Sequence, residues 1–337
     1  MINFIQFTFT RAVLSIVTLL IVCFIVFSLM ELVPGTCAER YLAFKNTQGS
    51  QITFEDIAAE ERRLGLDKPF LYRYTKWVSD IVIKQDFGDS CILRISINEL
   101  LSGRFVLSLI IAITALLFSY AIAIPVGIIS ATTKYASLDN ALKFISYLGI
   151  ALPNFLVALC IMLFMTVYYG DTMTGLFSQE YERAPWSAAK IKDFLSRAWL
   201  PIFVLGWNAT AFALQTVRAL MLDESDKLYV MAARARGISG MSLLWRYPAK
   251  HSLGPVINSI GFDLNRIFSA LPVVALILIL TEAGALLIEA LARSNDQQLA
   301  GAIIFLLTAT IVFVNFVTDI ILAIMDPRIR KGVMGGN

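Results

Sequence analysis

Few residues in this chain have side chains suited to catalysis or metal binding. His251 is the only histidine among 337 residues, and the four cysteines form no cluster with it. Neither the phosphate-binding pattern G-x-x-x-x-G-K-[ST] nor the zinc-binding pattern H-E-x-x-H occurs. A serine hydrolase needs a histidine base beside its nucleophile, and none is placed for that role. The sequence therefore favours a protein that is not an enzyme, with no catalytic residues and no metal site.

Polar residues inside apolar segments are the remaining candidates for a functional site. Asp263 and Arg266 are three residues apart, with Asn265 between them, and can pair along one face of a helix. Charged side chains at membrane depth are unfavourable unless they are paired or face water. The two residues are therefore either a structural ion pair or part of a polar pathway. Asn315 and Asp319 also share a helical face, and we expect them to bond to neighbouring helices, with a pathway role as the alternative.

The segments that carry these residues have the composition of membrane spans. The chain is 58% hydrophobic and only 16% charged, with a mean hydropathy of +0.72, whereas about a quarter of the residues in a soluble domain are charged. The net charge of +3 is too small to argue for nucleic acid as a partner. The pattern predicts an all-α integral membrane protein with six transmembrane helices, at residues 12–30, 105–130, 141–169, 198–222, 256–281 and 300–325.

Two features of these spans need interpretation. The first apolar run is longer than the apolar region of a signal peptide, about 7 to 15 residues, and it ends at Glu31. We therefore expect it to be retained as a membrane helix. Pro125 and Pro153 fall within the second and third spans. Proline is tolerated in membrane helices, so kinks are expected at both positions.

A polar segment separates the first two spans and is predicted to be an external subdomain. It covers residues 32–103, and Thr53 followed by Asp56 is typical of a capping box at a helix start. Cys37 and Cys91 both fall in this segment. They either form a disulfide or remain two unpaired thiols, because spacing alone cannot show that they are close.

The distribution of positive charge predicts the orientation in the membrane. Six spans place both termini on the same side, and short loops rich in lysine and arginine mark the cytoplasm. The connector at residues 223–255 is rich in lysine and arginine, and the C-terminal tail carries Arg328, Arg330 and Lys331. The loop at residues 282–299, in contrast, has Arg293 as its single basic residue. Both termini are thus expected in the cytoplasm. The predicted division is a first span with its N-terminal tail (1–31), an external, periplasmic subdomain (32–103) and a membrane core (104–337).

The basic connector at residues 223–255 is predicted to form two short helices. Ser225 or Asp226 can cap the first helix, and Gly237 can end it in the left-handed conformation. Ser239 can then cap a second helix that runs to Tyr247, before a proline. On these residues alone, the connector is either a docking element or an amphipathic segment on the membrane surface.

Several motifs along the chain resemble those of one family. Around the connector, Ala232, Ala233 and Gly237 are similar to the EAA region of permease subunits of bacterial ABC importers, and Pro255 follows at the family's distance. The resemblance is to the branch that includes dipeptide, oligopeptide and nickel permeases. Further matches lie in order along the chain, at residues 34–35, 64–69, 86–90, 124–127, 151–155 and 326–330.

The resemblance implies a fold, a set of partners and a function. It implies a type I ABC importer fold in the inner (cytoplasmic) membrane of a bacterium. It also implies a second, similar permease subunit, with a heterodimer expected, two cytoplasmic subunits that bind ATP and Mg²⁺, and an external solute-binding protein. The expected substrates are peptides, with nickel chelates, opines or other small solutes as alternatives. The residues expected to couple the permease to the ATPases are Tyr229, Met231, Ala232, Ala233, Arg234, Ala235, Arg236, Gly237 and Ser239.

This sequence departs from the family pattern in two places. Met231 occupies a position that is acidic or polar in the family, so a charge contact with an ATPase there is not expected. Residues 281–285 replace the family's acidic residue, phenylalanine and Pro-Gly-Leu-Gly turn, with only Gly284 in common. Two other classes of protein remain as alternatives: a secondary transporter or channel that works without ATPases, and a membrane scaffold protein.

Overall fold

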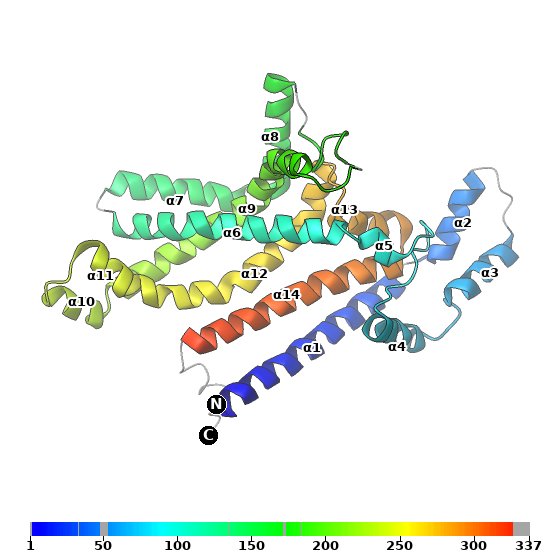
Figure 1. Ribbon diagram of the computed structural model, residues 1–337, viewed down its shortest axis with the longest axis horizontal. Coiled ribbons are helices and arrows are strands. Elements are labelled where there is room, and N and C mark those ends of the chain that lie inside the picture. Colours follow the sequence, from blue (N-terminus) through cyan, green and yellow to red (C-terminus); the bar gives the residue numbers. More distant parts are fainter. Residues whose placement is uncertain are drawn as a thin grey trace. The chain divides into compact units, whose positions relative to one another are not determined.

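The protein is all-α, as its sequence predicts. The computed structural model describes residues 2–32, 34–47, 53–133, 135–170, 173–182 and 184–325. Within these ranges the regular structure is helical, apart from one isolated antiparallel bridge between Asp89 and Ser96 (Figure 1). The closing motif at residues 326–330 and the basic residues of the tail lie outside the described ranges.

The chain divides into two compact units. The first comprises Met1–Arg11, Leu109–Leu280 and Phe313–Asn337, and the second comprises Ala12–Ser108 and Thr281–Val312. Three helices begin in one unit and end in the other: α1 (Ile2–Glu31), α6 (Arg104–Thr132) and α14 (Gln297–Met325).

The remaining helices belong to one unit each. The first unit holds α7 (Ala136–Ala151), α8 (Asn154–Tyr169), α9 (Ala188–Ser225), α10 (Leu228–Ala235), α11 (Gly240–Arg246) and α12 (Pro248–Ile277). The second unit holds α2 (Cys37–Thr47), α3 (Phe54–Leu64), α4 (Phe70–Ser79), a π-helical turn η1 (Asp80–Lys84), α5 (Ile97–Leu101), α13 (Ala283–Ile288) and a second π-helical turn η2 (Glu289–Ser294).

Five segments of the described chain are long and apolar enough to cross a membrane, and a bent pair of helices adds a sixth if the pair is counted as one span. The five contain α1, α6, α9, α12 and α14, at the positions predicted from the sequence. The helix α6 continues through Pro125 without a break. The helix α9 starts ten residues before the predicted span, at Ala188, after Ser187 accepts a hydrogen bond from the backbone N–H of Lys190.

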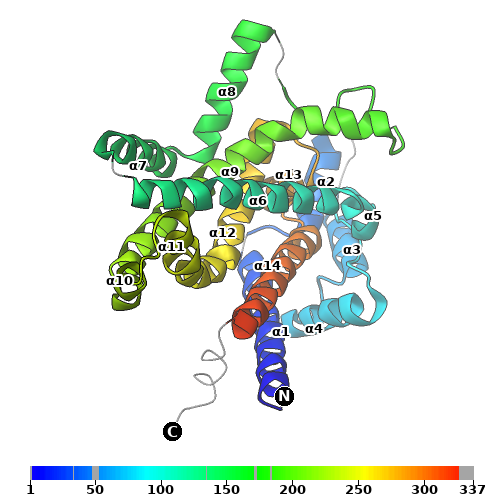
Figure 2. The same cartoon turned by 60° about the vertical axis from the view of Figure 1, so that its left-hand side comes forward.

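The third predicted span is not one kinked helix. Residues 141–169 form α7 and α8, which meet at an angle of 100° (Figure 2). Leu152 is extended, with ψ of 120°, and Pro153 begins the turn into α8. Proline disfavours the helical conformation in the residue before it. The expected kink is therefore a full break, and the sequence placed it correctly while underestimating its size.

Small residues allow the helices of the first unit to approach closely. Gly149 on α7 faces Ala211 on α9, and a Cβ atom added at Gly149 would lie 2.7 Å from the Cβ of Ala211. The hydroxyl of Ser146, one turn away, donates to the carbonyl of Ala211 at 2.8 Å. On α6, the hydroxyl of Ser119 donates to the carbonyl of Gly206 at 3.0 Å. Such contacts stabilise helix pairs inside a membrane, where apolar burial contributes little between helices.

The second unit is built around aromatic side chains. Phe27 on α1, Trp77 on α4 and Phe305 on α14 pack together, with ring centroids 5.7 Å apart for Phe27 and Trp77 and 6.1 Å apart for Trp77 and Phe305. The predicted capping box is present: Thr53 and Asp56 each accept a hydrogen bond from the backbone N–H of the other. These contacts order the polar segment that follows the first span.

Candidate functional site

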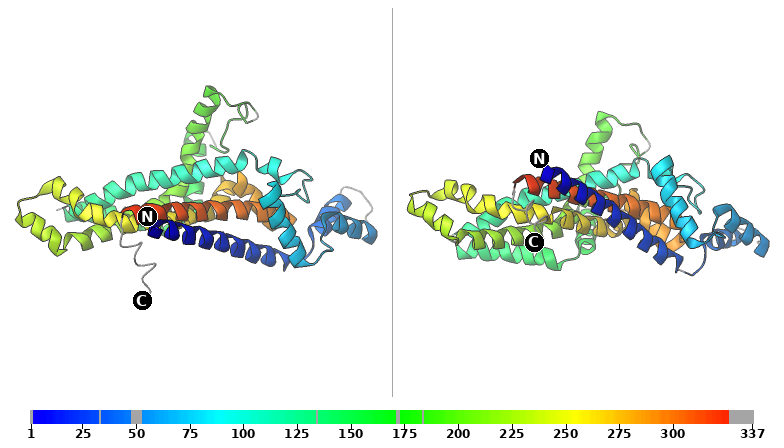
Figure 3. Two further views of the ribbon diagram at one scale, coloured as in Figure 1. Left: turned by 60° about the horizontal axis from the view of Figure 1, so that its bottom comes forward. Right: turned by 90° about the horizontal axis from the view of Figure 1, so that it is seen from below.

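The basic connector forms a helical hairpin between the ends of α9 and α12 (Figures 1 and 3). Its first helix, α10, ends where the sequence predicts. Gly237 has a φ of +83°, its N–H donates to the carbonyl of Arg234 at 3.0 Å, and the N–H of Ile238 donates to Ala233 at 3.2 Å. These two bonds are the Schellman motif that closes many helices. Gly237 is therefore required by the backbone conformation of the turn.

The start of α10 differs from the prediction. Neither Ser225 nor Asp226 caps it, because α9 continues through Ser225, whose hydroxyl donates to the carbonyl of Met221 at 2.6 Å. Lys227 occupies the N-cap position, without a capping bond from its side chain. Ser239 is the N-cap residue of α11, as predicted, but its side chain makes no capping hydrogen bond either.

The inner face of the hairpin packs on itself. Val230 and Ala233 from α10 and Leu243 from α11 are buried together. Tyr229 lies beside them, and its hydroxyl donates to Glu224 at 2.5 Å. Burial, and then the bond to Glu224, raise the pKa of Tyr229 above its ordinary value. Ala233 and Tyr229, two of the predicted contact residues, therefore pack within the hairpin, where Ala233 is buried and Tyr229 is half-buried.

The outer face of the hairpin is exposed and largely apolar. Leu228 is 80% exposed, Met231 48%, Met241 66% and Trp245 50%. Ala232, Arg234, Ala235 and Arg236 of α10 and the turn after it are also exposed. Large apolar side chains grouped on a short polar connector are typical of an interaction surface. We call these eight residues the outer coupling face.

Asp263 and Arg266 form the ion pair that the sequence allowed. Arg266 Nη1 lies 3.6 Å from Asp263 Oδ1, on the same helix α12. The other oxygen, Asp263 Oδ2, accepts a hydrogen bond from the Tyr120 hydroxyl at 2.6 Å and one from the Ser259 hydroxyl at 3.4 Å. Asp263 is thus buried and held by α6, whereas Arg266 is only half-buried.

Arg266 lines a cavity of about 460 Å³ in the first unit. The polar residues of its wall come from three helices: Asn154 from α8, Asn208 from α9, and Asn265, Arg266 and Ser269 from α12. Apolar walls include Phe155, Leu205, Phe262 and Val273. Asp263 does not line this cavity. Of the two alternatives for the pair, Asp263 is therefore placed as a structural residue and Arg266 as a residue of the polar cavity.

Asn315 and Asp319 each contact a different helix of the first unit. Asp319 forms an ion pair with Arg11 of α1, with Arg11 Nη1 3.2 Å from Asp319 Oδ2. Asn315 packs directly against Gly261 of α12, so closely that a Cβ atom added at Gly261 would overlap the side-chain amide. Both residues therefore connect α14 to its neighbours, and neither lines the cavity.

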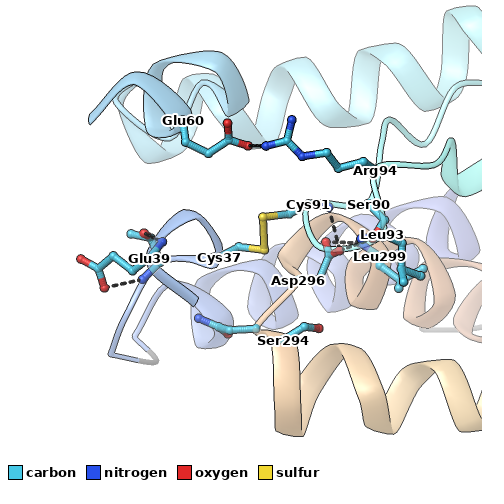
Figure 4. The surroundings of a disulfide bond; sticks show 12 residues. Cys37, Glu39, Glu60, Ser90, Cys91, Leu93, Arg94, Ser294, Asp296 and Leu299 are labelled. Carbon is cyan, nitrogen blue, oxygen red and sulfur yellow. Dashed lines mark hydrogen bonds and ion pairs between the residues drawn. A yellow bond between two sulfur atoms is a disulfide. The ribbon is translucent and has the colours of Figure 1, made fainter. Parts of the chain in front are cut away.

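Cys37 and Cys91 are joined by a disulfide in the second unit, which answers the question that spacing left open (Figure 4). The buried Asp296 lies beside it and accepts hydrogen bonds from the hydroxyl of Ser90 at 2.7 Å and the N–H of Cys91 at 2.9 Å. It also accepts the N–H of Leu299 at 3.1 Å, at the start of α14. Burial raises the pKa of Asp296, and the hydrogen bonds that its carboxylate accepts oppose that shift.

A second cavity, of about 720 Å³, lies within the second unit. Its wall includes the L-G-L motif and lysine at residues 64–68 and the D-F-G-D motif at residues 86–89, together with Arg73 and Trp77. Arg73 forms an ion pair with Glu31 at the end of α1. Two of the motifs that carry the family resemblance in the polar segment therefore line one concave, charged surface.

Comparison with known protein families identifies the chain. The family model described as "Binding-protein-dependent transport system inner membrane component" matches residues 123–331, and the model for the N-terminal part of such membrane components matches residues 4–94. The first match covers more than half of the chain and includes the hairpin, the ion pair and the cavity. The chain belongs to this family. It is a multi-pass permease component of the inner membrane.

Several curated relatives are similar to this permease over most of its length. The oligopeptide transport system permease protein AppB of Bacillus subtilis is 28% identical over 95% of this chain and 98% of its own. The inner membrane ABC transporter permease protein YejB of Escherichia coli O157:H7 is 30% identical over 82% of this chain and 76% of its own. The dipeptide transport system permease protein DppB of E. coli K12 is 25% identical over 96% and 98%.

A solved structure has the same fold as two thirds of this permease. It is a chain from an inward-facing form of the MetNI methionine ABC transporter, with a TM-score of 0.54 and 16% identity. The match covers 67% of this permease and 96% of that chain. The type I importer fold predicted from the sequence is therefore confirmed.

Some residues of the permease's two cavities were missed by reading the sequence. Asn154 is visible in the sequence only as part of the motif at residues 151–155, and nothing near Asn208 in the sequence marks it. Asn265, Arg266 and Ser269 share one face of α12 at helical spacing, and that spacing could have shown that Ser269 belongs with the pair. The link from Asp296 to the disulfide could not be recognised, because Ser90 and Cys91 lie more than 200 residues away in sequence.

Proposed function

We propose that this permease is a membrane subunit of an ATP-driven importer for peptides and forms half of the translocation pathway. The outer coupling face is the observation that carries the proposal. It is an exposed apolar surface on a hairpin continuous with α9 and α12, the two helices that contribute most of the 460 Å³ cavity. A partner that moves this hairpin would move the walls of that cavity.

The proposed partners follow from the family and from what this chain lacks. The sequence contains no phosphate-binding loop, so ATP and Mg²⁺ would be bound by two separate cytoplasmic subunits. These subunits would contact the outer coupling face, with Arg234 and Arg236 at its rim. A second, similar permease subunit would complete the pathway, and an external solute-binding protein would deliver the substrate.

We further propose that both termini and the hairpin lie in the cytoplasm and that residues 32–103 lie outside. The basic residues of the connector support this orientation, because short cytoplasmic loops are enriched in lysine and arginine. The disulfide between Cys37 and Cys91 supports an external position for the polar segment, since disulfides persist in oxidising compartments. The charged 720 Å³ cavity of that segment would then face the binding protein.

The proposal that peptides are the substrates rests on the relatives. AppB and DppB are named as oligopeptide and dipeptide permeases, and both match nearly the whole chain. The cavity in the first unit offers groups suited to peptides, namely side-chain amides and one guanidinium among apolar walls. Amide groups bond to a peptide backbone whatever its side chains are, which suits a transporter of varied peptides.

Copurification tests the proposed assembly. The tagged permease, extracted from native membranes in mild detergent, should bring with it two ATP-binding subunits and a second permease. As a matched control, Ala232→Glu places a charge on the outer coupling face and should lower the recovery of the ATP-binding subunits without removing them entirely, while the second permease remains. A permease recovered without ATP-binding subunits, yet able to transport, would instead be a secondary transporter or channel.

A further inference from the structure

Two residues that line the cavity beside Arg266 each have a buried polar atom without a hydrogen-bond partner. Arg266 Nη1 and Asn154 Oδ1 are both buried, and neither has a hydrogen-bond partner among the described residues. Both residues line the same 460 Å³ cavity. Buried polar groups in folded proteins are nearly always hydrogen-bonded. A ligand with complementary groups in this cavity would satisfy both the donor and the acceptor.

The environment of Arg266 holds its guanidinium in place. The guanidinium carbon lies 3.6 Å from the ring centroid of Phe212 and 4.8 Å from that of Phe262. The Asp263 carboxylate is 3.6 Å from Nη1, too far for a hydrogen bond, and its Oδ2 atom is already engaged by Tyr120. Asp263 thus offsets the charge of Arg266 without occupying its donors.

One exposed face of α12 carries polar residues that are unfavourable in contact with lipid. Asn265 and Ser269 are exposed beside the half-buried Arg266, whereas Asp263, Leu264 and Ile267 of the same helix are buried. Polar residues within membrane spans face a protein partner or a water-filled pathway and avoid lipid. This face of α12 is therefore expected to meet a protein partner or a water-filled pathway, and not lipid.

We propose that this cavity is a substrate subsite that binds the terminal carboxylate of a peptide through Arg266 and a peptide N–H through Asn154. An arginine fork matches the two oxygens of a carboxylate, and stacking on aromatic rings preorganises it. Asn154 Oδ1 can accept only from a donor such as a peptide N–H. The side-chain amide of Asn208 is engaged with the carbonyls of Gly149 and Ile150 at 3.3 and 3.4 Å, so it positions the wall at the α7–α8 break.

This subsite rests on the proposed function and specifies which end of the substrate the permease recognises. Asp263 is a positioning residue in this account, because it contacts Arg266 and not the cavity. The binding protein applies its own selection before the permease does. A test must therefore compare permease variants with the same binding protein, so that its preference is common to all of them.

Uptake of paired peptides tests the subsite. The complete transporter is reconstituted in proteoliposomes with ATP inside, and is given an equimolar mixture of tripeptides, each present with a free carboxylate and as its C-terminal amide. Mass spectrometry measures the ratio of the two forms taken up. Arg266→Gln should lower the carboxylate-to-amide ratio at least about tenfold, because a hydrogen-bonded charge pair is lost. The control Arg197→Gln removes an arginine outside the cavity and should leave the ratio unchanged.

The outcomes separate the subsite from the proposed function. If the wild-type transporter takes up neither form in an ATP-dependent way, the proposed function fails and the subsite fails with it. If uptake is normal and Arg266→Gln leaves the ratio unchanged, the subsite is wrong and the importer stands. If Arg266→Gln does not assemble, Arg266→Lys provides the test. Lysine keeps the positive charge but lacks the two-pronged guanidinium, so the carboxylate-to-amide ratio should fall about threefold. An unchanged ratio would overturn the subsite.

Discussion

Asp296 accepts a hydrogen bond from the backbone N–H of Cys91, with 2.9 Å between Oδ2 and the nitrogen. The same cysteine is bonded to Cys37, and the same carboxylate accepts the N–H of Leu299 at the start of α14. One buried side chain therefore joins the disulfide, the D-F-G-D-S segment and the last membrane helix within the second unit. The stability of the polar segment depends on this junction as well as on the disulfide.

Removing the Asp296 carboxylate should destabilise this junction. Asp296→Ala leaves three donors unpartnered, from Ser90, Cys91 and Leu299, and a buried donor without an acceptor costs about 1 to 3 kcal/mol. The variant also removes a buried carboxylate, and the cost of keeping that group out of water is then no longer incurred. We therefore expect the free energy of unfolding to fall by only about 2 to 3 kcal/mol. Thermal unfolding of the purified permease measures the change.

Two controls accompany the Asp296 variant. Asp296→Asn retains an acceptor oxygen and should lose less stability than Asp296→Ala. Asp89→Asn changes an exposed carboxylate of the same segment and should be close to neutral. Equal stability of Asp296→Ala and the wild type would show that the carboxylate does not hold the junction.

Two adjacent alanines of the hairpin should respond differently to the same substitution. Ala232 is exposed and Ala233 is buried against Val230 and Leu243. Ala232→Glu should leave the permease folded and uncouple ATP hydrolysis from uptake, because only the outer coupling face changes. Ala233→Glu should instead lower thermal stability, since it buries an unpaired charge. The account of the hairpin would be wrong if both variants were equally stable and equally active.

Gly237 should tolerate asparagine better than a β-branched residue. Its φ of +83° is in the left-handed region, which asparagine adopts more readily than valine does. Space is not the obstacle, since a Cβ atom at this position would meet nothing within 4 Å. Gly237→Val should therefore distort the end of α10, at about 1 to 2 kcal/mol, and reduce uptake, while Gly237→Asn retains most of it. The ATP consumed per peptide transported is the quantity to compare, and equal values for the two variants would contradict this reading.

Gly261 and Asn315 should show a compensating pair of substitutions. Gly261→Ala places a methyl group in the space of the Asn315 amide and should destabilise the permease by about 1 to 3 kcal/mol. Asn315→Ala frees that space, so the double variant should be more stable than Gly261→Ala alone. Thermal unfolding of the four proteins gives the coupling energy. Strictly additive effects would mean that the two side chains do not contact each other.

The sequence predicted the features that depend on local chemistry. Apolar run lengths predicted the membrane spans, and the left-handed preference of Gly237 predicted the end of α10. The capping box at Thr53 likewise needs only residues three positions apart. Each of these is decided within one or two helical turns, which is why a single sequence is sufficient.

The features that depend on tertiary contacts were not predictable in the same way. The direction in which Ala233 faces is set by packing of α10 on α11, so the sequence could not separate it from Ala232. The break at Pro153 was read as a kink, because sequence does not show whether neighbouring helices restrain a proline. The partners of Asp296 and the cavity around Arg266 come from segments far apart in the chain. They could be found only once the helices were placed.

ATP-dependent uptake of a peptide tests the central claim most directly. The complete transporter is placed in proteoliposomes with its binding protein outside. It should accumulate a labelled peptide only when ATP is present inside. The Ala232→Glu transporter should not accumulate the peptide, although it still hydrolyses ATP. Accumulation without ATP, or accumulation by Ala232→Glu at the wild-type rate, would contradict the account of this chain as a permease driven through its coupling hairpin.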